Sequence, residues 1–498
     1  MLYTSTRDNS IRVSSAQAIA QGISEEGGLF VPCELPSFSV DKISSMVSMS
    51  YIDRAKTVLR EFLTDFSEDE LDYCVSGAYA KEKFSSEKIA PTVNIDGNKN
   101  ILELWHGPTC AFKDMALQLL PYLMTVSAKK TADGKTIVIL VATSGDTGKA
   151  ALEGFKDVEN TKILVFYPVD GVSPMQKLQM TTQEGSNVAV CAINGNFDDA
   201  QSAVKSIFTN AEIKEELAKK NMMFSSANSI NWGRLVPQIV YYFSTYCDLV
   251  DMGKISAGDE INVVVPTGNF GNILAGYYAK KMGLPIKKLI CASNSNNVLT
   301  DFLKTGTYNK NRDFYTTTSP SMDILISSNL ERLLYHMSGE DDKLVSDLMK
   351  QLSENGQYTV SDSLISEIQT VFDAGCTSEE CVDSTIKAHF DKYNYLCDTH
   401  TAVAVKVYDE YVENTKDDIV SVIDSTASPY KFSASVLSAV LGGNSPELDE
   451  FDMVDELNRV TGAQIPAPLA NLKNKAVRFS DVCNKEDMSQ MVFKLLDL

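Results

Sequence analysis

One lysine stands in an unusual place in this sequence. Lys113 lies in the stretch "HGPTCAFKDMALQ" (106–118), between a phenylalanine and an aspartate and shortly after a Gly-Pro-Thr turn. The simplest interpretation is a lysine at a helix start, with its stem on apolar surface and its head in water. The alternative is an amine held in a partly dehydrated cleft, where it traps a carbonyl compound as a nucleophile. Lys113 alone does not decide between them.

The stretch "PTGNFGN" (266–272) follows an apolar run and has the composition of an anion site. Gly268 and Gly271 let the backbone approach an oxyanion closely, and a helix starting near Asn272 would point free N–H groups at that anion. The loop lacks both the Gly-Lys-Ser/Thr ending of ATP-binding loops and the Gly-x-Gly-x-x-Gly of dinucleotide sites, so neither ATP nor NAD is indicated. A glycine turn needed only for packing remains the alternative.

The stretch "VATSGDTGKAA" (141–151) has the same shape, and we expect it one sheet position away from the first loop. It presents Ser144, Asp146 and Thr147 at a helix start. An ordinary helix cap would use the same residue types.

A third cluster, "SSANSINWGRLVPQ" (225–238), supplies Asn228, Ser229 and Arg234. Amide, hydroxyl and guanidinium donors suit a phosphate ester, although a helical arginine is more often a salt-bridge partner. Two anion sites and one misplaced lysine suggest a phosphorylated cofactor and a phosphorylated substrate. Pyridoxal phosphate fits, because its aldehyde needs a lysine, its phosphate needs a helix N-terminus and its ring nitrogen needs a partner. The hydroxyls of "DSTASP" (424–429) could be that partner, and they would favour chemistry at the β and γ carbons over transamination.

Composition limits the alternatives. A chain of 498 residues is expected to form roughly two to four domains. Its net charge of −21 would repel nucleic acids and anionic membranes, so we expect neither as a partner, and anionic ligands must be attracted locally. The ten cysteines are scattered and no two of the four histidines have metal-ligand spacing, which indicates buried thiols and no metal site. Without a signal peptide or a run of about 20 apolar residues, we expect a cytoplasmic protein.

The elements that must position these loops are short apolar strands separated by helical segments. We predict strands at 100–105, 136–143, 162–168, 187–193, 261–267 and 288–293, with a further one in "DIVSVI" before residue 424. This pattern predicts a doubly wound α/β fold around a mostly parallel sheet, with the ligand loops at the carboxyl ends of the strands. The first ~95 residues look like a separate, more helical unit.

The motifs in their order resemble the threonine synthase family, in its longer bacterial and fungal branch, among the fold type II pyridoxal-phosphate enzymes. The resemblance spans residues 3 to about 432 and is carried by "YTSTRD", "AIAQGISEEGGLFVP", "LWHGPTCAFKDMALQ", "VATSGDTGKAALEGF", "VSPMQKLQMTT", "ANSINWGRLVPQ", "PTGNFGN", "SPSMDILISSNLERLL" and "DTHTAVA".

The resemblance implies roles for individual residues. Lys113 corresponds to the lysine that forms the Schiff base with the cofactor, and the hydroxyl of Thr426 would face the pyridine nitrogen. The cofactor phosphate would be bound by Gly268, Asn269, Phe270, Gly271 and Asn272. The substrate phosphate would be bound by Thr147, Asn228, Ser229 and Arg234, with Ser144 and Asp146 lining the substrate side. Two motifs depart from the family: Ser428 stands where a histidine is common, and "DTHTAVA" replaces Asp-Pro-His-Thr-Ala-Val-Gly, which puts the local loop geometry in doubt.

The resemblance also implies a fold, a domain plan and a reaction. Two cofactor-flanking α/β domains, similar to tryptophan synthase beta, would follow an N-terminal domain (1–95). The large domain would comprise 96–130 and 226–432, the smaller domain 131–225, and a C-terminal segment 433–498. The reaction would convert O-phospho-L-homoserine and water to L-threonine and phosphate, in a monomer or weak homodimer. A serine/threonine dehydratase or phospho-amino-acid lyase is the second interpretation, and a noncatalytic pyridoxal-phosphate or nucleotide-binding protein is the third.

Overall fold

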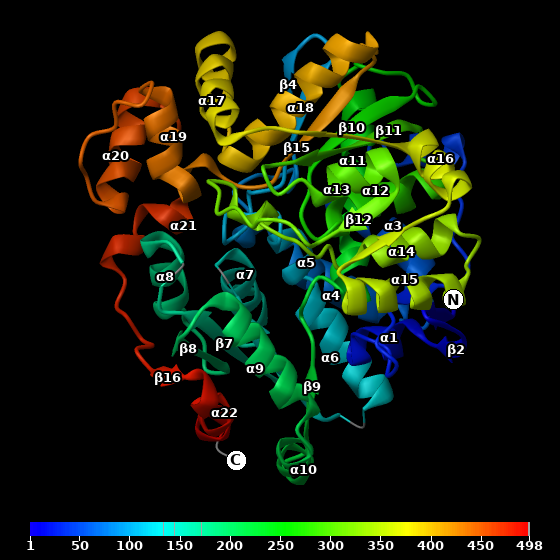
Figure 1. Cartoon of the computed structure of the whole chain (residues 1–498), viewed down its shortest axis with the longest axis vertical. Coiled ribbons are helices and arrows are strands. Elements are labelled where there is room, and N and C mark those ends of the chain that lie inside the picture. The colour runs from blue at the N-terminus through cyan, green and yellow to red at the C-terminus, as the bar shows by residue number, and fades with distance from the viewer. Residues whose placement is uncertain (133, 144, 171, 497–498) are drawn as a thin grey trace.

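The apolar strands form two parallel sheets in the computed structural model, which describes residues 1–132, 134–143, 145–170 and 172–496 (Figure 1). The larger sheet has the order β14-β11-β10-β15-β5-β4, and all its neighbours are parallel except β4, which is antiparallel to β5. Its strands are β4 (Thr92–Asp96), β5 (Lys99–Glu103), β10 (Ile261–Pro266), β11 (Ile286–Ser293), β14 (Phe372–Cys376) and β15 (Ser421–Ser425). The doubly wound α/β prediction is confirmed.

The smaller sheet has the order β16-β8-β7-β6-β9 and is wholly parallel. Its strands are β6 (Thr136–Ala142), β7 (Thr161–Pro168), β8 (Val188–Asn194), β9 (Met222–Ser225) and β16 (Val482–Asn484). The prediction that the loop after β6 lies one sheet position from the loop after β10 was therefore wrong, because the two strands belong to different sheets. Hydrophobic periodicity identifies strands, but it does not say which strands pair.

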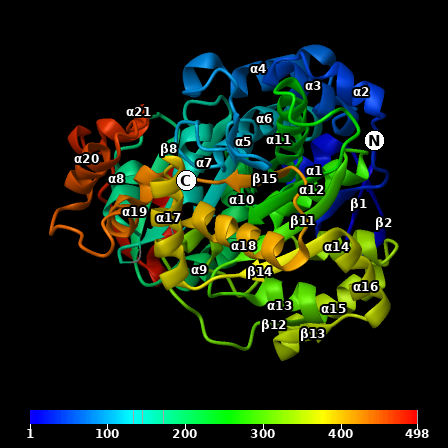
Figure 2. The same ribbon diagram turned by 90° about the horizontal axis from the view of Figure 1, so that it is seen from above.

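Helices cover both faces of the larger sheet (Figure 2). Helices α11 and α12 supply side chains that contact Asp424 of β15, whereas α18 contacts the next residue, Ser425, so successive residues of this strand face different helices. The helices and short elements that belong here are α5 (Asp114–Leu117), α11 (Trp232–Asp251), α12 (Gly271–Lys281), α13 (Val298–Thr305), β12 (Thr307–Asn309), η2 (Pro320–Met322), α14 (Leu330–Met337), α15 (Asp342–Asn355), β13 (Gln357–Thr359), α16 (Asp362–Val371), α17 (Glu379–Tyr393), α18 (Thr399–Thr415) and η3 (Pro429–Phe432). The smaller sheet is accompanied by α6 (Leu120–Thr131), α7 (Asp146–Phe155), α8 (Pro174–Thr181), α9 (Phe197–Thr209) and α10 (Ala211–Lys219).

The N-terminal residues form a small sheet and four helices, three of which pack against α11. These elements are β1 (Tyr3–Ser5), β2 (Asp8–Val13), α1 (Ser15–Gln21), β3 (Phe30–Pro32), α2 (Val40–Ser45), α3 (Tyr51–Phe62) and α4 (Glu68–Ala78). A capping box formed by Ser67 and Glu70 begins α4. A buried ion pair of 2.7 Å between Arg54 and Asp248 joins α3 to α11. The N-terminal part is thus fastened to the larger sheet's helices.

Residues after 432 return to the smaller sheet, a role that sequence patterns did not indicate. Helices α19 (Ser433–Val440), α20 (Glu450–Thr461) and α21 (Ala467–Ala470) precede β16, which pairs with β8, and α22 (Met488–Leu496) follows (Figure 1). Met488 and Val492 of α22 are buried in the same apolar cluster as Cys191 of β8. The domain boundaries given above stay predictions.

None of the helices in the described ranges has the length and apolar character that crossing a membrane would require. All ten cysteines are free thiols, and seven of them are buried.

Candidate active site

Lys113 lies in the loop that joins β5 to α5, and its side chain is only 10% exposed. Its Nζ donates a hydrogen bond of 3.2 Å to Ser321 Oγ and lies 3.8 Å from Asp146 Oδ2. Burial lowers the pKa of Lys113 to about 8, since the partial compensation by Asp146 is opposed by the cations Lys431 and Arg234. A buried amine that is about half neutral at pH 8 fits the reactive-amine interpretation and not the surface-lysine interpretation.

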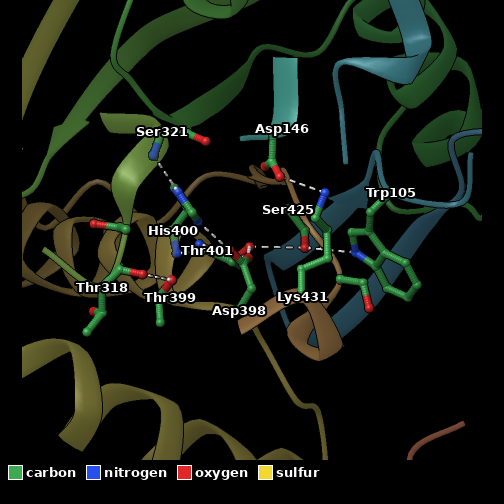
Figure 3. A network of polar contacts seen from close by, with 12 residues as sticks. Trp105, Asp146, Thr318, Ser321, Asp398, Thr399, His400, Thr401, Ser425 and Lys431 are labelled. Carbon is green, nitrogen blue, oxygen red and sulfur yellow. Dashed lines mark hydrogen bonds and ion pairs between the residues drawn. The ribbon is translucent and has the colours of Figure 1, made fainter. Parts of the chain in front are cut away.

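Asp146 is the first residue of α7 and is shared between two lysines. Lys431 Nζ, wholly buried, lies 2.7 Å from Asp146 Oδ1 (Figure 3). Gln176 Nε2 of α8 donates to the same oxygen at 3.2 Å. Burial alone would raise the pKa of Asp146, but Lys431 and Lys113 lower it below its ordinary value. Asp146 is therefore a fixed negative charge beside Lys113. Ser144, predicted to line the substrate side, lies outside the described residues.

The loop Gly268–Asn272 follows β10, and α12 begins at Gly271. Among the described residues, none of its five backbone N–H groups donates to a protein acceptor. Its carbonyl groups are held instead: Ser327 Oγ donates to Gly268 O at 2.8 Å, and Asn329 Nδ2 donates to Asn269 O at 2.9 Å. The donors thus remain free at a helix N-terminus, which is the arrangement that binds a phosphate.

Two residues of this loop have special backbone requirements. A Cβ at Gly268 would lie 2.6 Å from Ser321 O, so only glycine lets the turn that carries Ser321 approach this closely. Phe270 adopts the left-handed conformation with φ of 62° as the N-cap of α12. The loop is therefore shaped by contact with the η2 turn, which also contacts Lys113.

The residues predicted to hold a second anion lie between β9 and the first turn of α11. Arg234 is 4% exposed; its guanidinium donates to Ala227 O at 2.6 Å, while its Nε has no partner. No carboxylate in the described ranges lies within ion-pair distance of Arg234, and burial lowers its pKa to about 10. A buried guanidinium without a counter-charge is unfavourable until an anion binds.

Ser229 connects this segment to the loop after β10. Its hydroxyl lies 3.2 Å from Ser328 Oγ, which in turn donates to Asn269 Oδ1 at 3.3 Å. Asn228 is exposed and Thr147 is partly buried, and no interaction of either side chain with another described residue was found. The two predicted anion sites are therefore neighbours joined by Ser328.

Thr426, predicted to face the pyridine nitrogen, lies at the end of β15 next to the Lys113 loop. Its carbonyl oxygen accepts a hydrogen bond of 2.8 Å from Phe112 N, and its side chain is 6% exposed. The hydroxyl of Ser425 points to the other face of the sheet, where it accepts from Trp105 Nε1 at 3.0 Å. Ser428, which stands in place of the family's histidine, caps η3 by accepting from Tyr430 N.

Asp398, His400 and Lys431, which were not predicted from sequence as site residues, hold the two side-chain partners of Lys113 in place. His400 Nε2 accepts a hydrogen bond of 3.2 Å from Ser321 N, and its Nδ1 lies 2.7 Å from Asp398 Oδ2 (Figure 3). Because Nε2 is an acceptor, Nδ1 carries the proton that Asp398 accepts. Asp398 also caps α18, and an aspartate two residues before a histidine at a helix start was the available signal. Lys431 had no comparable signal.

Family models match three parts of the chain. Residues 2–79 match the model described as threonine synthase N terminus, residues 101–363 match pyridoxal-phosphate dependent enzyme, and residues 401–492 match threonine synthase, C-terminal.

Individual proteins are similar over nearly the whole chain. The threonine synthase of Pseudomonas aeruginosa is 38% identical over 89% of this chain and 91% of its own length. The structure of pyridoxal-phosphate-bound threonine synthase from Brucella melitensis is 37% identical, with a TM-score of 0.88 and 99% of both chains covered. Threonine synthase-like 1 of Macaca fascicularis is 42% identical over 85% of this chain, which spans only 58% of that protein's length.

Proposed function

The chain belongs to the threonine synthase family of pyridoxal-phosphate-dependent enzymes, and from this premise we propose that it converts O-phospho-L-homoserine and water to L-threonine and phosphate. Pyridoxal phosphate, when bound, supplies an aldehyde that captures an amine and a ring that withdraws electrons from the neighbouring carbon atoms. Lys113 would hold its aldehyde carbon, and the free N–H groups of Gly268–Asn272 would hold its phosphate. Everything else in the reaction falls to side chains of this protein.

Lys113 is placed to move the protons. With a pKa of about 8 its amine is partly neutral near physiological pH, so it is suited to take a proton first from Cα and then from Cβ of the substrate. The electron pair of the broken Cβ–H bond forms a Cβ–Cγ double bond as phosphate leaves Cγ, and Lys113 then returns a proton to Cγ. Asp146 stabilises the protonated form of Lys113 through its negative charge at 3.8 Å. Ser321 orients the same amine by accepting its hydrogen bond. Water then adds at Cβ, a proton returns to Cα, and the product is threonine.

The observation that carries the choice of substrate is the unpaired guanidinium of Arg234. A cofactor phosphate is already accounted for by the loop after β10, so a second buried cation beside Lys113 calls for a second anion. A phosphate ester on the substrate supplies it, whereas the substrates of serine and threonine dehydratases carry no such group. A buried arginine without a counter-charge therefore favours a phosphorylated amino acid over the unphosphorylated substrates of a dehydratase.

The test combines cofactor and product analysis on one preparation. Purified protein should be yellow, should lose that colour on borohydride treatment with the label on Lys113, and should release phosphate and threonine from O-phospho-L-homoserine in equal amounts. Release of phosphate together with a keto acid, without threonine, would indicate the phospho-amino-acid lyase of the second interpretation. Deamination of L-serine or L-threonine at a higher kcat/KM would refute the proposed substrate.

A further inference from the structure

Asp424 is a buried aspartate that the proposed reaction does not use. It precedes Ser425 and Thr426 in β15, and its side chain is wholly buried on the face of the sheet that α11 and α12 cover. Its partners are Tyr242 of α11 and Asn272 of α12, the last residue of the cofactor-phosphate loop. The carboxyl group of Asp424 thus contacts the cofactor-phosphate loop at one end of the cofactor site. Its strand, β15, leads to Thr426 at the other end.

The hydrogen bonds around Asn272 are few and short. Asn272 Nδ2 donates to Asp424 Oδ2 at 3.0 Å, and Tyr242 Oη lies 2.6 Å from Asn272 Oδ1 and 3.0 Å from Asp424 Oδ2. Tyr241 Oη also contacts Asn272 Oδ1 and lies 3.1 Å from Gln238 Oε1. Each tyrosine hydroxyl has only one hydrogen to donate, so Tyr242 donates either to Asn272 or to Asp424.

No cation balances Asp424. Within the described residues it forms no ion pair, and its Oδ1 has no hydrogen-bond partner. The titratable groups that face it are Tyr241 and Tyr242 of α11, whose pKa values burial raises well above the ordinary value of 10, so both stay neutral. Helix α12 contributes only the uncharged Asn272, and the residue paired with Asp424 on β5 is Leu102. Burial raises the pKa of Asp424 to about 7.

We propose that Asp424 is a positioning residue that holds the cofactor-phosphate loop in its binding geometry when protonated and weakens cofactor binding when ionised. In the protonated state Asp424 donates a hydrogen bond to Tyr242 Oη, which leaves the Tyr242 proton for Asn272 Oδ1, and Tyr241 donates to Gln238. Each of these three hydroxyl groups then has an acceptor, and Asn272 is held from both ends of its amide. This inference rests on the proposed role of Gly268–Asn272.

Ionisation reverses one hydrogen bond. The carboxylate of Asp424 accepts a hydrogen bond from Tyr242, so Tyr242 no longer donates to Asn272. A negative charge also lies behind a loop that binds an anion, which weakens the binding of that anion. By linkage, a bound phosphate must make Asp424 harder to ionise, and cofactor binding must therefore take up protons.

The experiment compares the wild-type full chain, freed of cofactor, with the isosteric variant Asp424→Asn. The probe is 4′-deoxypyridoxine 5′-phosphate, which lacks the aldehyde and so binds without reacting with Lys113. Its Kd is measured between about pH 6 and pH 9, and the ratio of wild type to variant at each pH cancels the titrations of Lys113 and of the phosphate. We expect this ratio to rise about tenfold across the range, which corresponds to a one-unit increase in the pKa of Asp424 on binding.

Proton uptake gives an independent readout. Calorimetric binding at about pH 7.5 in two buffers of different ionisation enthalpy should show more protons taken up by wild type than by Asp424→Asn. Equal uptake, or a Kd ratio that does not change with pH, would overturn the proposal.

Two further variants separate the possible failures. Tyr242→Phe should bind the probe more weakly than wild type at pH 6 and equally at pH 9, which tests the proposal even where Asp424→Asn does not fold. A Tyr242→Phe variant that is weaker by the same factor at both pH values would contradict it. If Asn272→Ala binds the probe as wild type does, the assignment of the cofactor-phosphate loop itself is wrong, whatever Asp424 does.

Discussion

Lys113 and Arg234 are both buried cations, but only Lys113 has a carboxylate nearby, so Arg234 is the one that needs a bound anion. If Arg234 binds the substrate phosphate, Arg234→Ala should lower kcat/KM for O-phospho-L-homoserine about 10- to 150-fold, the equivalent of losing a charged hydrogen bond of about 1.5–3 kcal/mol. Cofactor content should stay at the wild-type level. The kcat/KM of Arg234→Lys should lie between those of wild type and Arg234→Ala. Steady-state kinetics and absorbance on one preparation check this. A parallel loss of cofactor would place Arg234 in the cofactor site instead.

The charges around Lys113 predict opposite effects of two substitutions. Asp146→Asn removes the anion 3.8 Å from the amine, so the pKa of Lys113 should fall below about 8. Lys431→Gln removes a nearby cation and leaves the charge of Asp146 unshared, so that pKa should rise. The pH dependence of Lys113 labelling by trinitrobenzenesulfonate in cofactor-free protein, located by mass spectrometry, measures both. Shifts in the same direction would contradict the electrostatic account.

The part of the site that could be predicted from sequence is the part that is local in sequence. Lys113 and Gly268–Asn272 each lie within one short motif, where a glycine turn and a helix start reveal an anion site. Ser321, His400 and Lys431 reach Lys113 only through tertiary packing across hundreds of residues. Apart from the Asp398–His400 spacing at the start of α18, no sequence pattern separates these residues from surface residues.

At the scale of elements, the strands predicted from apolar runs begin and end within a few residues of those observed, because buried parallel strands need apolar residues on both faces. Their assignment to two sheets depends on packing and was not visible in the periodicity. Strand β16 was missed because its three residues, Val482–Asn484, carry no pattern of their own and pair only at the edge of an existing sheet.

Helix α22 should matter for stability far from the active site. Met488 is fully buried in the apolar cluster beneath β8, so Met488→Ala should lower the free energy of unfolding by about 2–5 kcal/mol. Lys494→Ala, on the exposed side of the same helix, is the matched control and should have little effect. Urea unfolding followed by circular dichroism provides the comparison. Equal midpoints for the two variants would show that α22 is not packed as described.

At the scale of the whole molecule, buried carboxyl groups set the pH dependence of stability. The pKa of Asp424 is raised by burial from 3.8 to about 7, so its contribution is most favourable below pH 4 and is lost as pH rises through 7. Asp424→Asn should therefore stabilise the cofactor-free protein more at pH 8 than at pH 5, by about 2.5 kcal/mol, because the folded state binds one proton more than the unfolded state over the two pH units between 5 and 7. Thermal unfolding at both pH values measures the difference, with the exposed Asp313→Asn as control. A gain that does not depend on pH would show that Asp424 does not titrate in this range.

The position of β15 has a consequence for synthesis on the ribosome. This strand, Ser421–Ser425, lies between β10 and β5, although it is made long after both. Until β15 emerges, β5 and β10 each have an unpaired edge where β15 will bind. The backbone groups and apolar residues along these edges stay exposed in the nascent chain. At roughly 5–20 residues per second, the interval between β10 and β15 lasts on the order of ten seconds or more. A pause in translation within α17 or α18 would prolong the exposure of these strand edges, and chaperones would have to cover them.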